Sequence, residues 1–254
     1  MNHHLAIALS FTLPCLSTTV GALLIFFFKK ESKKLNLLTI NFASGIMFSA
    51  SFWSLLVPSL EYSKVFWDSL AIIPVTLGFL LGALLMIVVD LLTKHMLQCR
   101  KTPKITHTYK IFTAITIHNI PEGLSVGFAI GSAIATNSAI TTAFMFSVGI
   151  ALQNLPEGLA TALPIFSCIK NTKRAFLLAF LSGVVEPLFA IFGYLLATKI
   201  SCLLPWLLSF SAGTMIYVII DDLLPEVNFK KKSPYGTWAF IMGFVVMMIL
   251  DICF

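Results

Sequence analysis

The sequence predicts an all-α integral membrane protein in which eight transmembrane helices form inverted repeats in a 3+2+3 order, with both termini outside. Three observations lead to this prediction. Of the residues, 58% are hydrophobic and 11% are charged, whereas a soluble domain has about 25% charged residues. Apolar runs of about 20 residues, the length that crosses a bilayer as a helix, recur along the chain. A seven-residue motif also occurs twice, in two consecutive runs.

The eight apolar runs are connected by short segments that leave no room for a soluble domain, so residues 1–254 are predicted to form a single polytopic transmembrane domain. Backbone groups in hydrocarbon must be paired within their own segment, and the runs lack the strict alternation of barrel strands, which favours helices. The runs cover approximately residues 5–28, 35–57, 70–92, 111–130, 139–166, 175–197, 203–224 and 235–254.

The basic residues predict the orientation of these spans. Only Lys64 and Lys199 follow even-numbered spans. The other fifteen of the seventeen follow spans one, three, five and seven: Lys29, Lys30, Lys33, Lys34, Lys94, Arg100, Lys101, Lys104, Lys110, Lys170, Lys173, Arg174, Lys230, Lys231 and Lys232. The positive-inside rule therefore places the odd-numbered loops in the cytoplasm and both termini outside. The net charge of +6 is explained by this distribution, and no nucleic-acid surface is expected.

The duplicated motif reads HNIPEGL at residues 118–124 and QNLPEGL at residues 153–159. An ionisable group at the centre of a bilayer costs roughly 2.5–3.5 kcal/mol on translocon scales, so a glutamate placed there twice predicts a compensating partner, for which a bound cation is the obvious candidate. Spans four and five run in opposite directions, so the two copies meet antiparallel near the midplane, as in many secondary transporters.

A second, weaker repeat supports an inverted arrangement. Residues 45–47 (Gly-Ile-Met) in span two resemble residues 213–215 (Gly-Thr-Met) in span seven, and each is followed by Leu-Leu and then Pro. The three spans at each end of the chain are therefore predicted to be inverted copies that flank the central pair.

The motif residues have the chemistry of a metal site. His118 and Glu122 are four residues apart, so on a helix an imidazole and a carboxylate share one face and can bind one ion. Gln153 and Glu157 repeat this geometry. A proline inside each copy frees a backbone carbonyl. The neighbouring Asn119 and Asn154 offer neutral oxygen atoms to the same site.

Five other residues are weighed individually. Glu186, at central depth in span six, is predicted to be a metal ligand or a proton carrier, against the alternative of a carboxylate buried for packing. Met47 is more often an adaptable core residue than a ligand. Asp222, near the inner end of span seven, is a candidate exit contact. Asp90 and Asp251 lie toward helix ends and are expected to be interfacial.

The predicted donor set of one imidazole, carboxylates and amide oxygens suits Zn²⁺, Fe²⁺, Mn²⁺ or Co²⁺ better than Cu⁺. The expected function is transport of such an ion, without catalysis and without a prosthetic group. One alternative is an intramembrane zinc metalloenzyme, although His118 is followed by Asn119 and no second histidine completes an H-E-x-x-H motif. The other alternative is a metal-selective channel, for which weaker and more solvated contacts are expected.

With these motifs, the chain resembles the ZIP family of zinc and iron transporters and, within it, the compact prokaryotic zinc-uptake type. The resemblance is carried by the eight spans, by His-Asn-x-Pro-Glu-Gly in the fourth span and by the related motif in the fifth. It implies alternating-access transport of divalent metals into the cytoplasm, chiefly Zn²⁺, with Fe²⁺, Mn²⁺, Co²⁺ and Cd²⁺ as further substrates, through a multi-pass protein of the plasma or inner membrane. By motif match, it implies a set of metal-binding residues: His118, Asn119, Glu122, Gln153, Asn154, Glu157, Glu186 and Met47.

The chain departs from the family pattern at three places. Gln153 stands where many members carry histidine, Asn154 where some carry an acid, and Ser54 where related prokaryotic chains place an acid near the end of helix two. A weaker site, no tightly held second ion and a weakened outer acidic entrance are therefore expected. The resemblance also favours movement of spans one, four, five and six against the rest. Gly78 and Gly82 are candidates for packing a second subunit in a homodimer, or equally a neighbouring helix.

Overall fold

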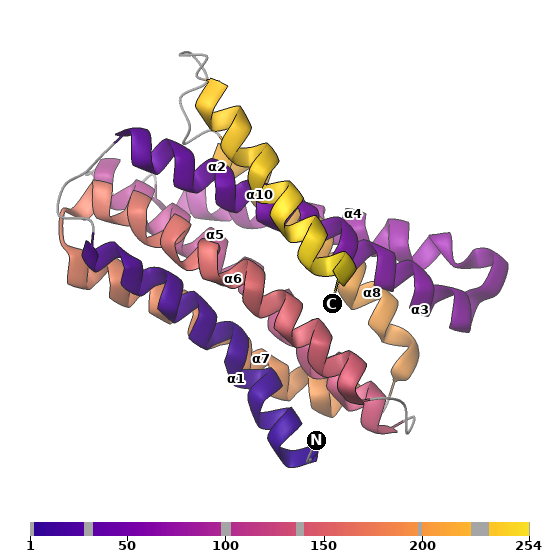
Figure 1. Ribbon diagram of the computed structural model, residues 1–254. Coiled ribbons are helices and arrows are strands. Elements are labelled where there is room, and N and C mark those ends of the chain that lie inside the picture. The colour runs from indigo at the N-terminus through magenta and orange to yellow at the C-terminus, as the bar shows by residue number, and fades with distance from the viewer. Residues whose placement is uncertain are drawn as a thin grey trace.

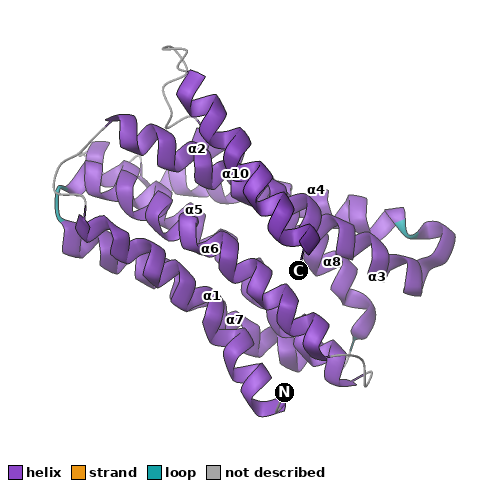
Figure 2. Cartoon of the chain, viewed as in Figure 1, coloured by secondary structure: helices purple, strands orange, loops and turns teal. Residues whose placement is uncertain are grey.

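The structure, a computed structural model, describes residues 3–27, 33–97, 103–135, 140–197, 200–224 and 234–253, which are almost entirely helical and contain no strand (Figures 1 and 2). The helices are α1 (His3–Leu23), α2 (Lys33–Ala50), α3 (Val57–Trp67), α4 (Ile72–Leu97), α5 (Pro103–Ala135), α6 (Ile140–Ile169), α7 (Thr172–Ala197), α8 (Leu204–Val218) and α10 (Pro234–Cys253). Short 3₁₀ or π turns adjoin them: η1 (Leu24–Phe27), η2 (Ser51–Leu56), η3 (Asp68–Leu70), η4 (Ser201–Leu203) and η5 (Ile219–Leu223).

The predicted membrane spans are confirmed as helices, but the second one is longer than expected. It was predicted to end at residue 57, whereas α2, the π turn η2 and α3 continue one another as far as Trp67. The N–H of Val57 bonds to the carbonyl of Phe52, five residues back, and Pro58 follows in the first turn of α3. Proline is tolerated in the first turn of a helix because its missing N–H is not needed there, so it does not end the span.

Within the described part of the chain, six helical segments are long and apolar enough to cross a membrane by length and composition alone, so the protein is a multi-pass membrane protein. They are His3–Phe27, Lys34–Leu70, Ile72–Thr93, Thr172–Ala197, Leu204–Leu223 and Pro234–Cys253. The helices α5 and α6 are 33 and 30 residues long, but the polar residues of the two motifs lower their hydropathy. The two helices that carry the predicted site are therefore not among these six segments.

The helices pack as two groups. In the first, which we call the motif group, α5 packs along α7 and α1 packs along α6. In the second, the flanking group, α2 packs along α10, and α8 packs along α4 and α3. The groups meet chiefly where α5 contacts α8 and where α6 contacts α2. This division is symmetric, because α2 and α8 hold equivalent places in the two predicted repeats.

Close glycine contacts confirm the inverted repeat. In each repeat, two glycines let paired helices approach so closely that an added Cβ would collide with a backbone carbonyl. The contacts are Gly45 with Phe240 and Gly243 with Phe42 in one repeat, and Gly213 with Phe79 and Gly82 with Phe210 in the other. A π turn also begins one helical turn after Met47 in η2 and one helical turn after Met215 in η5. Equivalent positions therefore have equivalent backbone structure.

The same contacts decide between the two roles weighed for Gly78 and Gly82. Gly78 faces Ser209 and the carbonyl of Trp206, and Gly82 faces the carbonyl of Phe210, all of them in α8 of the same chain. These glycines pack a neighbouring helix, so they do not provide a surface for a second subunit.

The two ends of the bundle differ in charge. The side chains of Lys34, Lys170, Lys173 and Arg174 are exposed where α2 begins, α6 ends and α7 begins, and we call this the basic end. The start of α1 and the end of α10 lie at the opposite end of the bundle (Figure 1). Other basic residues used for the orientation lie outside the described residues: Lys29, Lys30, Arg100, Lys101, Lys199, Lys230, Lys231 and Lys232.

Candidate metal site

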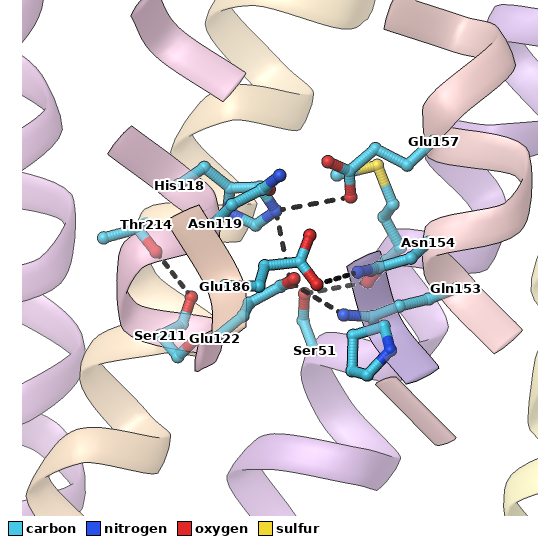
Figure 3. Close-up of polar contacts among 12 residues, drawn as sticks. Ser51, His118, Asn119, Glu122, Gln153, Asn154, Glu157, Glu186, Ser211 and Thr214 are labelled. Carbon is cyan, nitrogen blue, oxygen red and sulfur yellow. Dashed lines mark hydrogen bonds and ion pairs between the residues drawn. The ribbon is translucent and has the colours of Figure 1, made fainter. Parts of the chain in front are cut away.

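The two copies of the motif face each other inside the motif group (Figure 3). His118, Asn119 and Glu122 come from α5, Gln153, Asn154 and Glu157 come from α6, and Glu186 comes from α7. None of these side chains is more than 1% exposed. The structure thus brings together, in the interior, seven of the eight residues predicted to bind metal.

A cluster of three residues has the geometry of a metal-binding site. One ligand atom from each of His118, Glu122 and Glu157 lies within 4.8 Å of the others. The Nε2 atom of His118 is 3.2 Å from Oε1 of Glu122 and 3.7 Å from Oε2 of Glu157. The first distance follows from the i, i+4 spacing on α5. The distance from His118 to Glu157 is short because α6 packs against α5 at the motif.

Oxygen atoms around this cluster lack hydrogen-bond donors. They are Oδ1 of Asn119, Oε2 of Glu122, Oε1 of Gln153, Oδ1 of Asn154 and both carboxylate oxygens of Glu157. Buried polar groups are normally hydrogen-bonded, and buried carboxylates are costly unless they are paired or coordinate a metal. A divalent cation would supply the missing partner, and a donor set of oxygens with one imidazole suits borderline to hard ions.

Gln153 is bonded to a neighbouring ligand. Its Nε2 donates to Oε1 of Glu122 over 2.7 Å, which holds that carboxylate in place. An amide nitrogen has no lone pair to offer to a cation, so ligation by Gln153 requires its Oε1, which has no hydrogen-bond donor.

Glu186 lies beside the three-residue cluster and is bonded to Asn154 of the second motif. The Nδ2 atom of Asn154 donates to Oε2 of Glu186 over 2.9 Å, and the hydroxyl of Thr18 donates to Oε1 over 3.4 Å. Asn119 donates to the carbonyl of Ser182 over 3.0 Å. Sequence reasoning missed Thr18, although the spacing that relates Met47 to Met215 also relates Thr18 to Glu186, so comparing the repeats residue by residue would have found it.

The glycines of the two motifs bring α1 and α7 against the site. A Cβ on Gly123 would collide with the backbone of Glu186, and one on Gly158 would collide with the backbone of Thr18. Without these contacts, Thr18 and Glu186 would lie farther from the motif residues. Small residues allow close helix approach in membranes in this way.

The remaining candidate residues lie outside the cluster. Met47 is fully buried in the core, and its carbonyl accepts a hydrogen bond from Ser51 over 2.9 Å. Asp222 is half-buried in the π turn η5. Ligation by Met47 and exit past Asp222 both stay predictions.

A cavity of about 470 Å³ opens between the two groups at the end opposite the basic end. Its walls reach Leu152, the residue before Gln153. It is also lined by Glu61, Asp251 and Ser54, and the hydroxyl of Ser54 donates to Oδ1 of Asp251 over 2.6 Å. The helix α10 thus places an acid directly beside Ser54. The weakened outer entrance and the interfacial role of Asp251 both stay predictions.

A buried group of side chains able to bind metal, held between antiparallel helices of an inverted repeat, is the arrangement found in many transporters. Comparison with known protein families also indicates a transporter. The family described as "ZIP Zinc transporter" matches this chain over residues 104–251. The chain belongs to the ZIP family, as its motifs predict.

Several relatives resemble the chain over most of its length. "Zinc transporter ZIP11" of Bos taurus is 34% identical, with 92% of this chain and 93% of the relative covered. "Zinc transporter ZupT" of Chlorobium luteolum is 32% identical, with 98% of each covered. "Zinc transporter GufA" of Myxococcus xanthus is 40% identical over 54% of this chain and 52% of the relative.

Proposed function

We propose that this protein carries divalent transition-metal ions, chiefly Zn²⁺, into the cytoplasm by alternating access. The observation that carries the proposal is the cluster of His118, Glu122 and Glu157, buried between antiparallel helices and surrounded by oxygens without donors. The relatives named as zinc transporters support zinc as the main substrate. The same donor set also accepts other divalent ions as lesser substrates: Fe²⁺, Mn²⁺, Co²⁺ and Cd²⁺.

Each residue has a role in this proposal. His118, Glu122 and Glu157 are the primary ligands, and Gln153 adds its side-chain oxygen while its nitrogen positions Glu122. The remaining residues assist the ion before or after it occupies the main site: Asn119, Asn154, Glu186, Met47 and, on the exit pathway, Asp222.

The basic end is assigned to the cytoplasm because exposed lysine and arginine side chains gather there, in accordance with the positive-inside rule. Both termini and the cavity then face the outside. The metal ion enters by the cavity, passes Leu152 and exchanges water for the ligands. We place this single polytopic domain in the plasma or inner membrane of the cell.

Alternating access requires that the two groups move against each other. The motif group holds all the primary ligands, so its displacement relative to the flanking group carries the ion from one side to the other. The packing supports this division, because α1, α5, α6 and α7 contact each other more extensively than they contact the flanking helices.

The two alternatives fit less well. A metalloprotease of the H-E-x-x-H type needs two histidines on its metal and a glutamate base, whereas the described cluster holds His118 and two carboxylates. A channel needs a hydrated path, whereas every side chain of this cluster is fully buried. We therefore class the protein as a carrier without enzymatic activity.

The proposal is tested with purified protein in liposomes that contain a zinc-sensitive dye. Glu122→Ala and Glu157→Ala should each lower the initial rate of zinc uptake by roughly tenfold or more, since outer-sphere changes at metal sites already lower affinity or activity by about 10–100-fold. Asp68→Asn, an exposed acid in the turn after α3, is the control and should keep the rate. Unchanged uptake in both glutamate variants would reject the site.

A further inference from the structure

The two groups are joined at the basic end by a hydrogen bond between side chains. The Nδ2 atom of Asn36, near the start of α2 in the flanking group, donates to the hydroxyl of Ser167, near the end of α6 in the motif group, over 3.0 Å. Both residues are half-buried. We propose that this bond is a latch that keeps the basic end closed while the opposite end is open. The proposal rests on the transport function described above.

The latch differs from two other serine bonds between helices, each of which lies within one group. Ser147 donates to the carbonyl of Ser10, joining α6 to α1, and Ser59 donates to the carbonyl of Pro205, joining α3 to α8. Such bonds are kept when the groups move as rigid bodies. The bond between Asn36 and Ser167 crosses the boundary, so any separation of the groups at the basic end must break it.

The inverted repeat shows what stands at the opposite end in place of the latch. Eleven residues before Met47 is Asn36, and eleven residues before Met215 is Leu204. Similarly, ten residues after Glu157 is Ser167, and ten residues after Glu122 is Ser132. The counterpart of the latch is therefore Leu204 with Ser132.

Leu204 cannot hydrogen-bond through its side chain, so the counterpart pair cannot form the bond that Asn36 and Ser167 form. Leu204 instead lines the cavity between the groups. The two ends thus differ at equivalent positions: a polar pair spans the closed end, and an apolar residue lines the open one. This broken symmetry indicates that the latch biases the protein toward the state that is open at the cavity end.

Removing the latch should favour the state that is open at the basic end. The net effect of one neutral hydrogen bond corresponds to a roughly two- to twelvefold change in an equilibrium constant. Ser167→Ala and Asn36→Ala should therefore raise the ratio of basic-end-open to basic-end-closed molecules several-fold. Ser59→Ala is the matched control, because it removes a serine hydrogen bond between two helices of the same group.

The populations of the two states are measured by pulsed electron–electron double resonance. Spin labels are attached to Lys34→Cys in α2 and Lys173→Cys in α7, because both lysine side chains are exposed at the basic end. The native cysteines are replaced by serine in this background. We expect the longer-distance population to grow several-fold in the Ser167→Ala and Asn36→Ala proteins and to stay constant in the Ser59→Ala protein. Identical distance distributions in all of them, or an equal change in the control, would overturn the latch.

A cross-link provides a second test. Asn36→Cys combined with Ser167→Cys should form a disulfide on oxidation, because the side chains already touch. Oxidised protein in liposomes should lose zinc uptake, and reduction should restore it. Full uptake with a complete cross-link would contradict the latch. The spin-label distances require no transport, so they test the latch even if the proposed substrate is wrong.

Discussion

Gln153 and His118 hold the same place in the two copies of the motif, yet their side chains act differently. His118 presents Nε2 to two carboxylates, whereas Gln153 donates through its amide nitrogen to Glu122. The two copies are both helical, but they carry different side chains at this position. The helix α5 therefore supplies the only imidazole of the described cluster. We therefore expect selectivity among divalent ions to depend on residue 153.

Replacing Gln153 by histidine should increase the preference for Zn²⁺ over Mn²⁺. A second imidazole suits zinc, whereas oxygen donors suit manganese. The measurement is zinc uptake in the presence of increasing Mn²⁺, for wild type and Gln153→His. An unchanged ratio of the two ions would mean that residue 153 is outside the coordination sphere.

Asp251 is expected to act at the mouth of the cavity. Its carboxylate lies beside Ser54 and lines the same space as Glu61, where negative charge raises the local concentration of cations. Asp251→Asn should raise the KM for zinc several-fold and leave the maximal rate nearly unchanged, most clearly at low salt. Asp68→Asn serves again as the control. A lower maximal rate at unchanged KM would argue that Asp251 has a structural role instead.

At the scale of elements, glycines determine how closely the helices of each group approach. Gly158 lies against the backbone of Thr18 in α1, whereas the nearest atoms to a Cβ on Gly149 of the same helix are 3.7 Å and 3.8 Å away. The two glycines are therefore a matched pair, one at a tight helix crossing and one beside a cavity wall.

Gly158→Ala should destabilise the protein by about 1–3 kcal/mol, the usual range for overpacking a tight interior. Gly149→Ala should stay within about 0.5 kcal/mol of wild type. Thermal unfolding of the purified protein in detergent measures both effects. Equal melting temperatures for the two variants would show that the crossing of α1 and α6 tolerates more separation than the contact indicates.

At the scale of the whole molecule, an ion at the proposed site would link α5 to α6. The cluster takes ligands from α5 and from α6, so an ion can bind it only when these helices are packed together. Binding should therefore stabilise the folded protein.

Zinc at about 100 times its Kd should add roughly 2.7 kcal/mol of stability. The expected result is a higher melting temperature with Zn²⁺ in the wild type, and a loss of this increase in Glu122→Ala and Glu157→Ala. Mg²⁺, which prefers an octahedral oxygen environment, is the control ion. An equal increase in the glutamate variants would place the stabilising ion elsewhere.

Local patterns determined much of this protein. The apolar runs set the number of spans, since only helices can pair their backbone groups in lipid. The spacing of His118 and Glu122 set their common face on α5, because helical periodicity is a local property. The second span was predicted to end at residue 57, whereas the helical segment continues through a π turn and Pro58 as far as Trp67.

Only the tertiary structure decided which side chains from different helices meet. The distance between His118 and Glu157, the bond from Thr18 to Glu186, the acid beside Ser54 and the bridge from Asn36 to Ser167 all join residues far apart in sequence. Such contacts depend on how closely the helices pack and on their relative rotation. These quantities result from the sum of many side-chain contacts between helices, whereas the periodicity of a single helix specifies only which of its own residues share a face.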